Sequence, residues 1–349
     1  MDRSRLEELL QRVSRVRMVV LGDFFLDSYL IMERRLSELS IETGLEAFQV
    51  VETRQYPGAA GTVVSNLRAL GVQVMAIGLY GDDGNGYILR RKLLEQKVDL
   101  RGFTEVTGML TPTYTKPMMR ELDGYEHELN RMDIKHRTAL PASLEETVSG
   151  HLQALLPEAD GMLVIDQVAE RNCGIITDRI RVEIGQMALL YPEKIICADS
   201  REYLGLFENV ILKSNVRESL RAAHQEHRAE EALAASAERC GHELSARTHH
   251  PVVITLGSEG LYLVENGQAE GCFLPSLPVN GPIDIVGAGD SVNASVGAAL
   301  CAGASLKEAG ILGNLAASVV IQQIGTTGTA TPRQILEQFD AHPEMEYFE

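Results

Sequence analysis

The chain has 349 residues, of which 45% are hydrophobic and 23% are charged, so it has ample apolar mass for a folded core and is not dominated by disorder. Its 49 Asp and Glu residues outnumber its 32 Lys and Arg residues, which gives a net charge of −17. Nucleic acids and anionic membranes attract basic proteins, so this charge argues against both as partners; an anionic small molecule needs only a local cluster of donors.

The N-terminal segment and the cysteines indicate a cytoplasmic protein. Leu6, Leu9, Leu10 and Val13 recur at helical spacing, without the continuous apolar run of a signal peptide. No segment approaches the roughly 20 apolar residues of a membrane span. The five cysteines lie far apart and form no CxxC pair, which favours reduced thiols over a disulfide framework or a zinc site.

Short apolar runs alternate with amphipathic segments along most of the chain. The runs are four to six residues long, as expected for buried strands: Met18–Gly22, Val74–Leu79, Met162–Asp166, Lys194–Asp199, Val210–Lys213 and Val252–Leu256. The segments between them have helical spacing: Thr62–Leu70, Tyr87–Lys97, Leu144–Leu156 and Gly174–Leu190. Strands that alternate with helices predict an α/β fold with a mainly parallel sheet, covered on both faces, whose ligands bind beyond the carboxyl ends of the strands.

Two segments depart from this alternation. Ala47–Glu52 and Pro112–Met119 have the composition of exposed strands with no helix beside them. They predict a small β lid, from about residues 29–56 and 111–120, on a single domain spanning residues 1–349; a simple β edge of the main sheet is the alternative. Exposed lid strands can pair with those of a second copy, so we expect a homodimer through the lid. The stretch from Glu218 to Ala246 predicts a surface helix.

The segment Asp284–Ser291 (DIVGAGDS) leads small residues directly into a helix. Gly287 and Gly289 allow a ligand to approach the backbone, and the first unpaired N–H groups of a helix form an anion site that suits phosphate. Asp290 lies where the loop becomes the helix. Its carboxylate either caps the helix or accepts the proton of a hydroxyl that attacks the bound phosphorus.

Two further segments follow predicted strands. Asn215 and Glu218 lie three apart at the start of a helix, a spacing that fits both a capping box and a pair of groups facing a hydrated Mg²⁺. The segment from Val253 to Gly260 is a strand, a glycine turn and the start of a second strand. This pattern fits a tight hairpin or a turn against which a nucleotide lies.

These segments, in this order, resemble the PfkB (ribokinase-like) family of carbohydrate kinases. The resemblance runs from about Val19 to Pro332, and the block Gly22–Asp27 (GDFFLD) is similar to the opening of the heptose-phosphate kinase branch. It implies a three-layer α/β/α fold with a β lid, and ATP-dependent transfer of a phosphoryl group to a hydroxyl of a sugar or sugar phosphate. A nucleoside kinase of the same fold, or a non-catalytic sugar or nucleotide sensor, is the alternative.

The resemblance also implies roles for individual residues. The catalytic base would be Asp290, beside an anion hole formed by Gly287, Ala288 and Gly289. Mg²⁺ would be held through its waters by Asn215 and Glu218, and a monovalent cation such as K⁺ by Asp284 and Val286. The nucleotide would lie near Asn215, Thr255, Gly257, Gly260 and Asn314, and the acceptor near Asp27, Gly58, Thr62, Asn66 and Lys116.

The sequence departs from the family pattern at its first signature. The usual second glycine of that signature is Ala59 here, and Thr62 stands where an asparagine often contacts the acceptor. A hydroxyl has a shorter reach than an amide and one donor instead of two, so the acceptor can differ from the branch's usual sugar phosphate. Lys116 lies in the predicted lid, where it could meet an acceptor phosphate or form a structural ion pair.

Overall fold

The computed structural model describes residues 1–228, 230–325 and 327–343. Its centre is a nine-stranded sheet in the order β16-β15-β14-β13-β12-β11-β1-β6-β7. Neighbouring strands from β14 to β7 are parallel, and only β15 and β16 run antiparallel to their neighbours, which confirms the predicted mainly parallel sheet. The strands are β1 (Arg17–Gly22), β6 (Gln73–Gly81), β7 (Asp99–Val106), β11 (Gly161–Asp166), β12 (Ile195–Ser200), β13 (Ile211–Asn215), β14 (Val252–Thr255), β15 (Gly260–Val264) and β16 (Cys272–Pro275).

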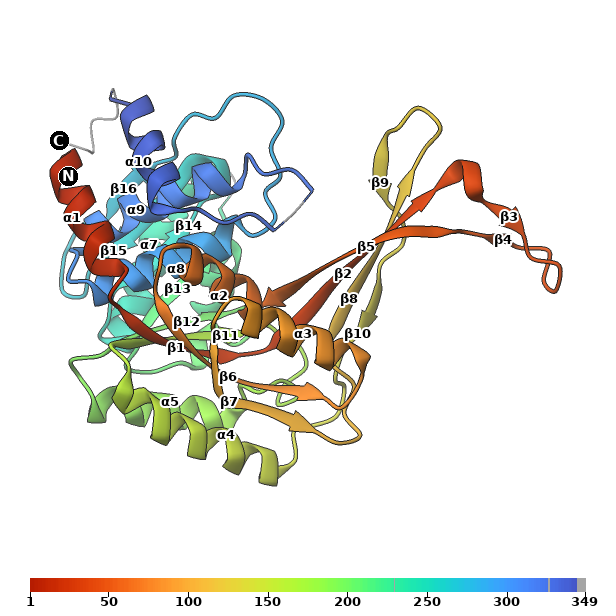
Figure 1. Cartoon of the computed structure of the whole chain (residues 1–349). Coiled ribbons are helices and arrows are strands. Elements are labelled where there is room, and N and C mark those ends of the chain that lie inside the picture. The colour runs from red at the N-terminus through yellow and green to blue at the C-terminus, as the bar shows by residue number, and fades with distance from the viewer. Residues whose placement is uncertain (229, 326, 344–349) are drawn as a thin grey trace.

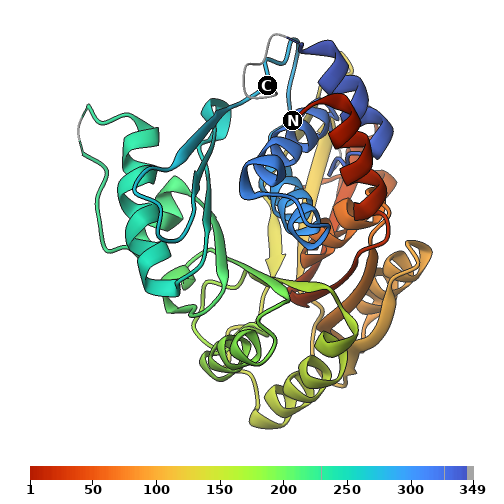
Figure 2. The same cartoon turned by 90° about the vertical axis from the view of Figure 1, so that its left-hand side faces the viewer.

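Helices cover both faces of this sheet (Figures 1 and 2). One apolar core joins the sheet to α1 (Arg3–Val13), α2 (Ala60–Ala69), α3 (Gly84–Glu95), α8 (Ala288–Cys301), α9 (Leu306–Val320) and α10 (Pro332–Ala341). A second core joins the other face to α4 (Ala142–Leu155), α5 (Asp178–Leu190), α6 (Val216–Ala222) and α7 (Leu233–Thr248). Because both faces are covered, all six residues of β11 are buried, which explains the continuous apolar runs in the sequence. No helix in the described ranges is long and apolar enough to span a membrane.

Two predicted helices differ from those observed. Helix α5 begins at Asp178, four residues later than expected, because the Thr177 side chain accepts a hydrogen bond from the Ile180 amide and caps the helix there. The stretch from Glu218 to Ala246 is not one surface helix. It is divided into α6 and α7 after His224, whose φ is 53°, and α7 buries one side against the second core.

A second sheet projects from the body as an arm, which we call the lid (Figure 1). Its strand order is β10-β8-β2-β5, and β9 also pairs with β8. Strand β2 follows β1 after the single residue Asp23, so the lid continues directly from the central sheet. The pairing is antiparallel except between β2 and β8. The lid strands are β2 (Phe24–Glu33), β5 (Val50–Ala59), β8 (Thr113–Arg120), β9 (Glu126–Glu128) and β10 (Met132–Ile134), and the pair β3 (Glu38–Leu39) and β4 (Glu46–Ala47) lies at the tip.

The lid returns to the body through a strained residue. The chain passes from β5 into α2 at Ala59, whose φ is 51° and ψ is −115°. Residues with a Cβ rarely adopt this conformation, which glycine adopts readily. A non-glycine residue in such a region costs about 1–3 kcal/mol.

We expect Ala59→Gly to raise the free energy of unfolding by about 1 kcal/mol, because the strain it relieves exceeds the backbone entropy that glycine adds to the unfolded chain. Urea unfolding of both proteins measures the difference. Ala60→Gly, one residue later inside α2, is the matched control and should destabilise the protein by about 0.5–1 kcal/mol. A loss of stability in Ala59→Gly would show that this backbone conformation carries no strain.

Candidate active site

The carboxyl ends of four neighbouring strands meet the first turn of α8 around one cavity. Strands β11, β12, β13 and β14 all end at this edge, and the cavity between them has a volume of about 200 Å³. Side chains with ionisable or polar groups dominate its lining, which consists of Ile165, Asp166, Gln167, Asp199, Arg201, Lys213, Asn215, Glu218, Thr255, Gly289 and Asp290. It therefore brings together five of the predicted site residues: Asn215, Glu218, Thr255, Gly289 and Asp290.

The N-terminus of α8 presents free donors to this cavity. Gly287 is the N-cap in the left-handed region, with φ 83°, and a Cβ on it would lie 3.7 Å from Thr62 Cγ2. The Ala288 amide donates to the Ile285 carbonyl at 3.3 Å. Among the described residues, the amides of Gly289 and Asp290 have no such partner. These two amides are therefore the donors of the helix N-terminus that are available to bind an anion, whereas the Ala288 amide already has a partner.

Asp290 lies half-buried in the first turn of α8. Burial raises the pKa of its carboxyl to about 7; the ammonium of Lys213 opposes this rise, and the carboxylates of Asp199 and Asp27 add to it. A carboxyl with this pKa can accept a proton near neutral pH, as a general base must.

A buried ion pair supports the floor of the cavity. Lys213 on β13 donates to Asp199 on β12, with 2.6 Å between Nζ and Oδ2. Burial acts to lower the pKa of Lys213, but the charge and hydrogen bond of Asp199, together with the charges of Asp290 and Glu218, outweigh it, and the pKa is raised. A Cβ on Gly289 would lie 3.4 Å from Nζ, so this ammonium lies beside the anion site. Asn293 on α8 also donates to Asp199 at 3.4 Å.

Asn215 and Glu218 form the capping box that their spacing allows. The Glu218 amide donates to Asn215 Oδ1 at 3.0 Å, and the Asn215 amide donates to Glu218 Oε2 at 2.8 Å. Both residues also line the cavity, so capping and a ligand contact are compatible. Burial and the Asp199 carboxylate raise the pKa of Glu218. Its Oε1 is not used by the capping box.

A second buried ion pair holds Asp166 at the end of β11. Asp166 Oδ2 accepts from Ser200 Oγ at 2.7 Å and lies 3.2 Å from Arg181 Nη2. Burial raises the pKa of Asp166 to about 7, helped by the Asp23 carboxylate and opposed by Arg181. Asp23 itself accepts three backbone N–H bonds of 2.8–3.1 Å, from Gln167, Val168 and Ile175, and thereby fixes the loop after β11.

The residues predicted on the nucleotide side divide into two groups. Thr255 lines the cavity, and a Cβ on Gly257 would meet nothing within 4 Å, so the turn after β14 is open to a ligand. Gly260 has a structural requirement: its φ is 117°, and a Cβ would lie 2.1 Å from the Leu274 carbonyl oxygen. The Asn314 amide is used to tie α9 to β16, since it donates to the carbonyls of Leu274 and Pro275 at 3.3 and 3.0 Å.

Three of the predicted acceptor residues, Asp27, Gly58 and Lys116, lie on the lid strands β2, β5 and β8, whereas Thr62 and Asn66 lie on α2. Asp27 is buried, its Oδ1 has no hydrogen-bond partner among the described residues, and its Oδ2 lies 3.6 Å from Lys116 Nζ. Burial raises the pKa of Asp27, against the opposing charge of Lys116. A Cβ on Gly58 would lie 2.8 Å from Asp27 Oδ1, so glycine leaves room for this carboxylate. Lys116 also donates to Tyr29 Oη at 2.9 Å.

The remaining predicted residues are held by local backbone contacts. Asn66 is buried and donates to the Thr62 carbonyl at 3.0 Å within α2. Asp284 accepts from the amides of Val286 and Gly325 at 3.0 and 3.4 Å. These contacts fix the loop before α8, whereas the Val286 side chain is exposed.

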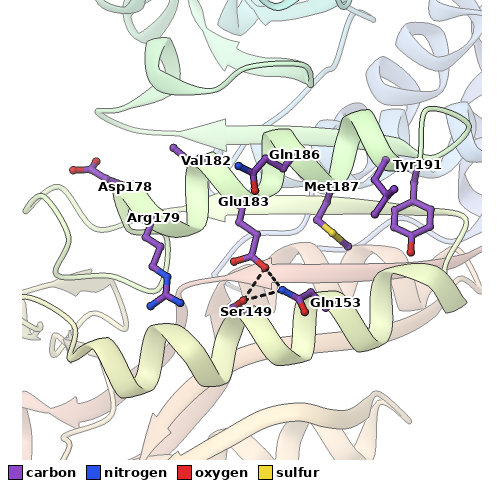
Figure 3. A pocket seen from close by; sticks show the side chains of 10 residues that line it. Ser149, Gln153, Asp178, Arg179, Val182, Glu183, Gln186, Met187 and Tyr191 are labelled. Atoms are coloured by element: carbon purple, nitrogen blue, oxygen red, sulfur yellow. Dashed lines mark hydrogen bonds between the residues drawn. The ribbon is translucent and has the colours of Figure 1, made fainter.

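A larger hollow of about 940 Å³ lies away from this edge, between α4 and α5 (Figure 3). Its polar side chains bond to one another: Ser149 Oγ and Gln153 Nε2 both donate to Glu183 Oε1, at 2.7 and 2.8 Å. It contains none of the predicted site residues. The smaller cavity is therefore the candidate active site.

Sequence reasoning did not assign a role to Lys213, Asp199 or Arg201. The sequence did contain a signal for Lys213, because a lysine at the end of the apolar run Val210–Lys213 needs a partner when it is buried. Its partner could not be identified, because Asp199 ends a different strand. Arg201 follows that strand and could not be distinguished from a surface charge.

Comparison with known proteins identifies the family of this chain. The chain matches the family model of the pfkB family carbohydrate kinases over residues 26–333. It is 28% identical over 351 residues to the bifunctional protein HldE of Geotalea uraniireducens (strain Rf4), covering 99% of this chain and 68% of the relative. It is 27% identical over 334 residues to that of Desulfatibacillum aliphaticivorans, covering 95% and 64%. The chain thus spans about two thirds of the length of these curated relatives.

Solved structures share the fold. Ribokinase from Arabidopsis thaliana, complexed with ribose and ATP, aligns with a TM-score of 0.66 at 19% identity, over 93% of this chain and 98% of that one. Phosphofructokinase-2 from Escherichia coli, in complex with fructose-6-phosphate, aligns with a TM-score of 0.69 at 17% identity, over 93% and 99%. These alignments confirm the ribokinase-like fold. Because the family match covers most of its length, the chain belongs to the pfkB family of carbohydrate kinases.

Proposed function

We propose that this protein transfers the γ-phosphoryl group of ATP to a hydroxyl of a sugar phosphate or a sugar, with Asp290 as the general base. The observation that carries the proposal is the position of Asp290: its carboxyl, with a pKa near 7, lies beside the free amides of an α-helix N-terminus. The charge of Asp27, whose Oδ1 has no hydrogen-bond partner among the described residues, acts on that pKa. Asp27 would hold acceptor hydroxyls, and the amides of Gly289 and Asp290 would bind the transferred phosphoryl group.

Basic groups around Asp27 support a phosphorylated acceptor. Lys116 and Arg131 both act on the pKa of Asp27, so their charges lie near the acceptor side. Arg131 is held by two hydrogen bonds to Asp133 at 2.7 and 2.9 Å, whereas Lys116 lies 3.6 Å from Asp27, so Lys116 is the main candidate for a phosphate. We therefore place heptose phosphates, which the resemblance of the Gly22–Asp27 block suggests, first among the acceptors to test.

A nucleoside acceptor has less support. Nucleoside pockets use free aromatic faces for stacking, and the aromatic rings on the acceptor side already have partners. Lys116 Nζ lies 4.6 Å from the centroid of the Tyr29 ring, and Tyr114 is stacked on Phe25 at 4.7 Å and contacted by Arg131 at 4.5 Å.

The oxygen donors of the cavity fit Mg²⁺. Glu218 has one carboxylate oxygen outside the capping box, and Asn215 lies beside it on the cavity wall. Mg²⁺ prefers oxygen ligands and keeps several waters, so these two residues would hold it. When bound, it offsets the negative charge of the triphosphate. We keep Asp284 and the Val286 carbonyl as the K⁺ proposal; comparing K⁺ and Na⁺ salts in the same assay tests it.

ADP release from MgATP tests the proposed function. The panel contains heptose phosphates, other sugar phosphates, free sugars and nucleosides, with Asp290→Asn as the negative control. Acceptor-dependent ADP release that is lost in the variant would support the kinase. Binding of ATP without ADP release on any acceptor would favour the non-catalytic sensor.

The rate should depend on pH through Asp290. A general base works when deprotonated, so kcat/KM for the acceptor should rise with pH and reach half its maximum near pH 7, where an ordinary aspartate would reach it near 4. A pH–rate profile measures this rise in kcat/KM. Asp166, whose pKa is also about 7, supplies the control, because Asp166→Asn should show the same rise. A profile that is flat between about pH 5.5 and 8.5 would contradict the assignment.

We also propose a homodimer formed through the lid. Exposed apolar side chains gather near its tip, at Leu36, Leu39, Ile41, Leu45, Phe48, Val50 and Val51. A monomer rarely leaves such a group in water, and the lid strands have free edges. Light scattering should give twice the 38.3 kDa of one chain, and Leu39→Glu with Ile41→Glu should reduce it to one. Leu189→Glu, an exposed apolar site on α5, should remain dimeric; a monomeric wild type would refute the proposal.

A further inference from the structure

Arg201 supplies a positive charge to the active-site cavity and has no ionic partner among the described residues. It directly follows β12 and lines the cavity with Asp290 and Glu218. Its backbone is fixed at both ends: its amide donates to the Asp166 carbonyl at 3.2 Å, and its carbonyl accepts from Arg221 Nη1 at 2.9 Å. Within the described ranges, its guanidinium makes neither a hydrogen bond nor an ion pair. The backbone of Arg201 is therefore fixed, while its guanidinium is available to bind a ligand.

Some of the other charges of the cavity are balanced in pairs. Lys213 is joined to Asp199 at 2.6 Å, and Asp166 lies 3.2 Å from Arg181. Asp290 and Glu218 form no ion pair with any described residue. Arg201 lowers the pKa of both, so its charge acts across the cavity on the proposed base and on the proposed metal-binding carboxylate.

Phosphoryl transfer places additional negative charge in this space. The bond from the γ-phosphorus to the oxygen that bridges it to the β-phosphorus breaks, and ADP leaves with the electron pair. A bond from the γ-phosphorus to the acceptor oxygen forms, and the hydroxyl proton passes to Asp290. During this step the charge spreads over three phosphoryl oxygens and the bridging oxygen. Lys213 adds little net charge there, because Asp199 neutralises it at close range.

We propose that Arg201 is a catalytic residue that donates hydrogen bonds to the oxygens of the transferred phosphoryl group. The inference rests on the proposed kinase function. A planar guanidinium with five donors matches phosphoryl oxygens better than a lysine ammonium does. Because its guanidinium makes no hydrogen bond or ion pair with another described residue, Arg201 can turn towards the phosphate without breaking one.

Arg201→Gln tests the proposal. We expect kcat to fall by about 10²–10⁴-fold, whereas KM for ATP changes by only a few fold, because the contact strengthens as charge develops. MgADP with aluminium fluoride, which mimics the transferring phosphoryl group, should bind more weakly to the variant in the presence of acceptor, while ATP affinity changes little. Arg201→Lys should recover part of kcat. Arg333→Gln is the matched control, since Arg333 is exposed on α10 and paired only with Glu337.

The outcomes separate this inference from the function on which it rests. An active wild type whose Arg201→Gln variant keeps kcat within about 3-fold would overturn the role of Arg201 alone. A rise in KM for ATP with unchanged binding of the aluminium fluoride complex would also overturn it, because it would show ground-state binding only. A wild type that releases no ADP on any acceptor would overturn the kinase function, and the inference with it. We expect the Tm of Arg201→Gln to equal that of the wild type, which would show that the loss of kcat does not come from misfolding.

Discussion

Replacing Asp290 by asparagine is expected to lower kcat by about 10²–10⁴-fold and, at the same time, to make the unliganded protein more stable. Asparagine keeps the size of the side chain but cannot accept the hydroxyl proton. The amides at the start of α8 and the residues beside Thr255 are unchanged, so KM for ATP should stay within a few fold. Steady-state kinetics with the best acceptor of the panel measures both quantities.

The gain in stability follows from the raised pKa. The folded state binds the Asp290 proton up to about pH 7, whereas the unfolded chain releases it near pH 4, so stability falls as pH rises between these values. At pH 7.5 the wild type carries this cost and Asp290→Asn does not. The variant should gain about 1 kcal/mol or more, and the gain should vanish below about pH 4.

Thermal unfolding at about pH 7.5 and pH 4 measures this difference. The control is Asp82→Asn, an exposed aspartate outside the cavity, which should leave both kcat and Tm unchanged. Full turnover in Asp290→Asn would refute its role as the base. A fall in Tm at pH 7.5 would show that its carboxylate stabilises the fold, as a helix cap would.

Asp27→Asn is expected to lower kcat/KM for the acceptor by about 10²-fold and to leave KM for ATP nearly unchanged. Asp27 Oδ1 is buried without a partner, and such an oxygen is costly unless a ligand donates to it. Hydrogen bonds to a charged carboxylate contribute about 1.5–3 kcal/mol each, and the amide replaces one acceptor by a donor. Initial rates at varied acceptor and fixed MgATP measure the loss.

The neighbour of Asp27 provides the control for this prediction. Ser28 lies on the opposite face of β2 and accepts a hydrogen bond from Gln55 at 3.3 Å, so Ser28→Ala should change acceptor kinetics little. An effect of Asp27→Asn that falls on KM for ATP instead of the acceptor would contradict the proposed division of the site.

These two carboxylates share a cause for their unusual pKa values. Burial is the main cause that raises the pKa of each carboxyl. A cation opposes this rise in each case, Lys213 for Asp290 and Lys116 for Asp27. A site that keeps carboxylates in low dielectric surroundings makes their interactions with a bound substrate stronger. The same arrangement costs stability, which is why substitution of Asp290 should affect turnover and stability in opposite directions.

Local sequence patterns were sufficient for the fold class and for several local features of the candidate site. The apolar runs identified six strands of the central sheet, because a strand covered on both faces is apolar throughout. The glycines before Asp290 predicted a helix N-terminus at the edge of the sheet. The spacing of Asn215 and Glu218 predicted the capping box. Each of these features depends on residues that are close together in the chain.

Other features depended on which segments the fold brings together. Lys213 and Asp199 pair because β13 lies beside β12, and neither strand's sequence reports that order. The strain at Ala59 follows from the backbone conformation with which the chain passes from β5 into α2. Asn314, which was predicted near the nucleotide, donates to the Pro275 carbonyl on β16, a contact that its own segment could not reveal. Hydrophobic periodicity is a property of one segment, whereas ion pairs, burial and pKa values arise from contacts between residues distant in sequence, so only the folded chain could reveal them.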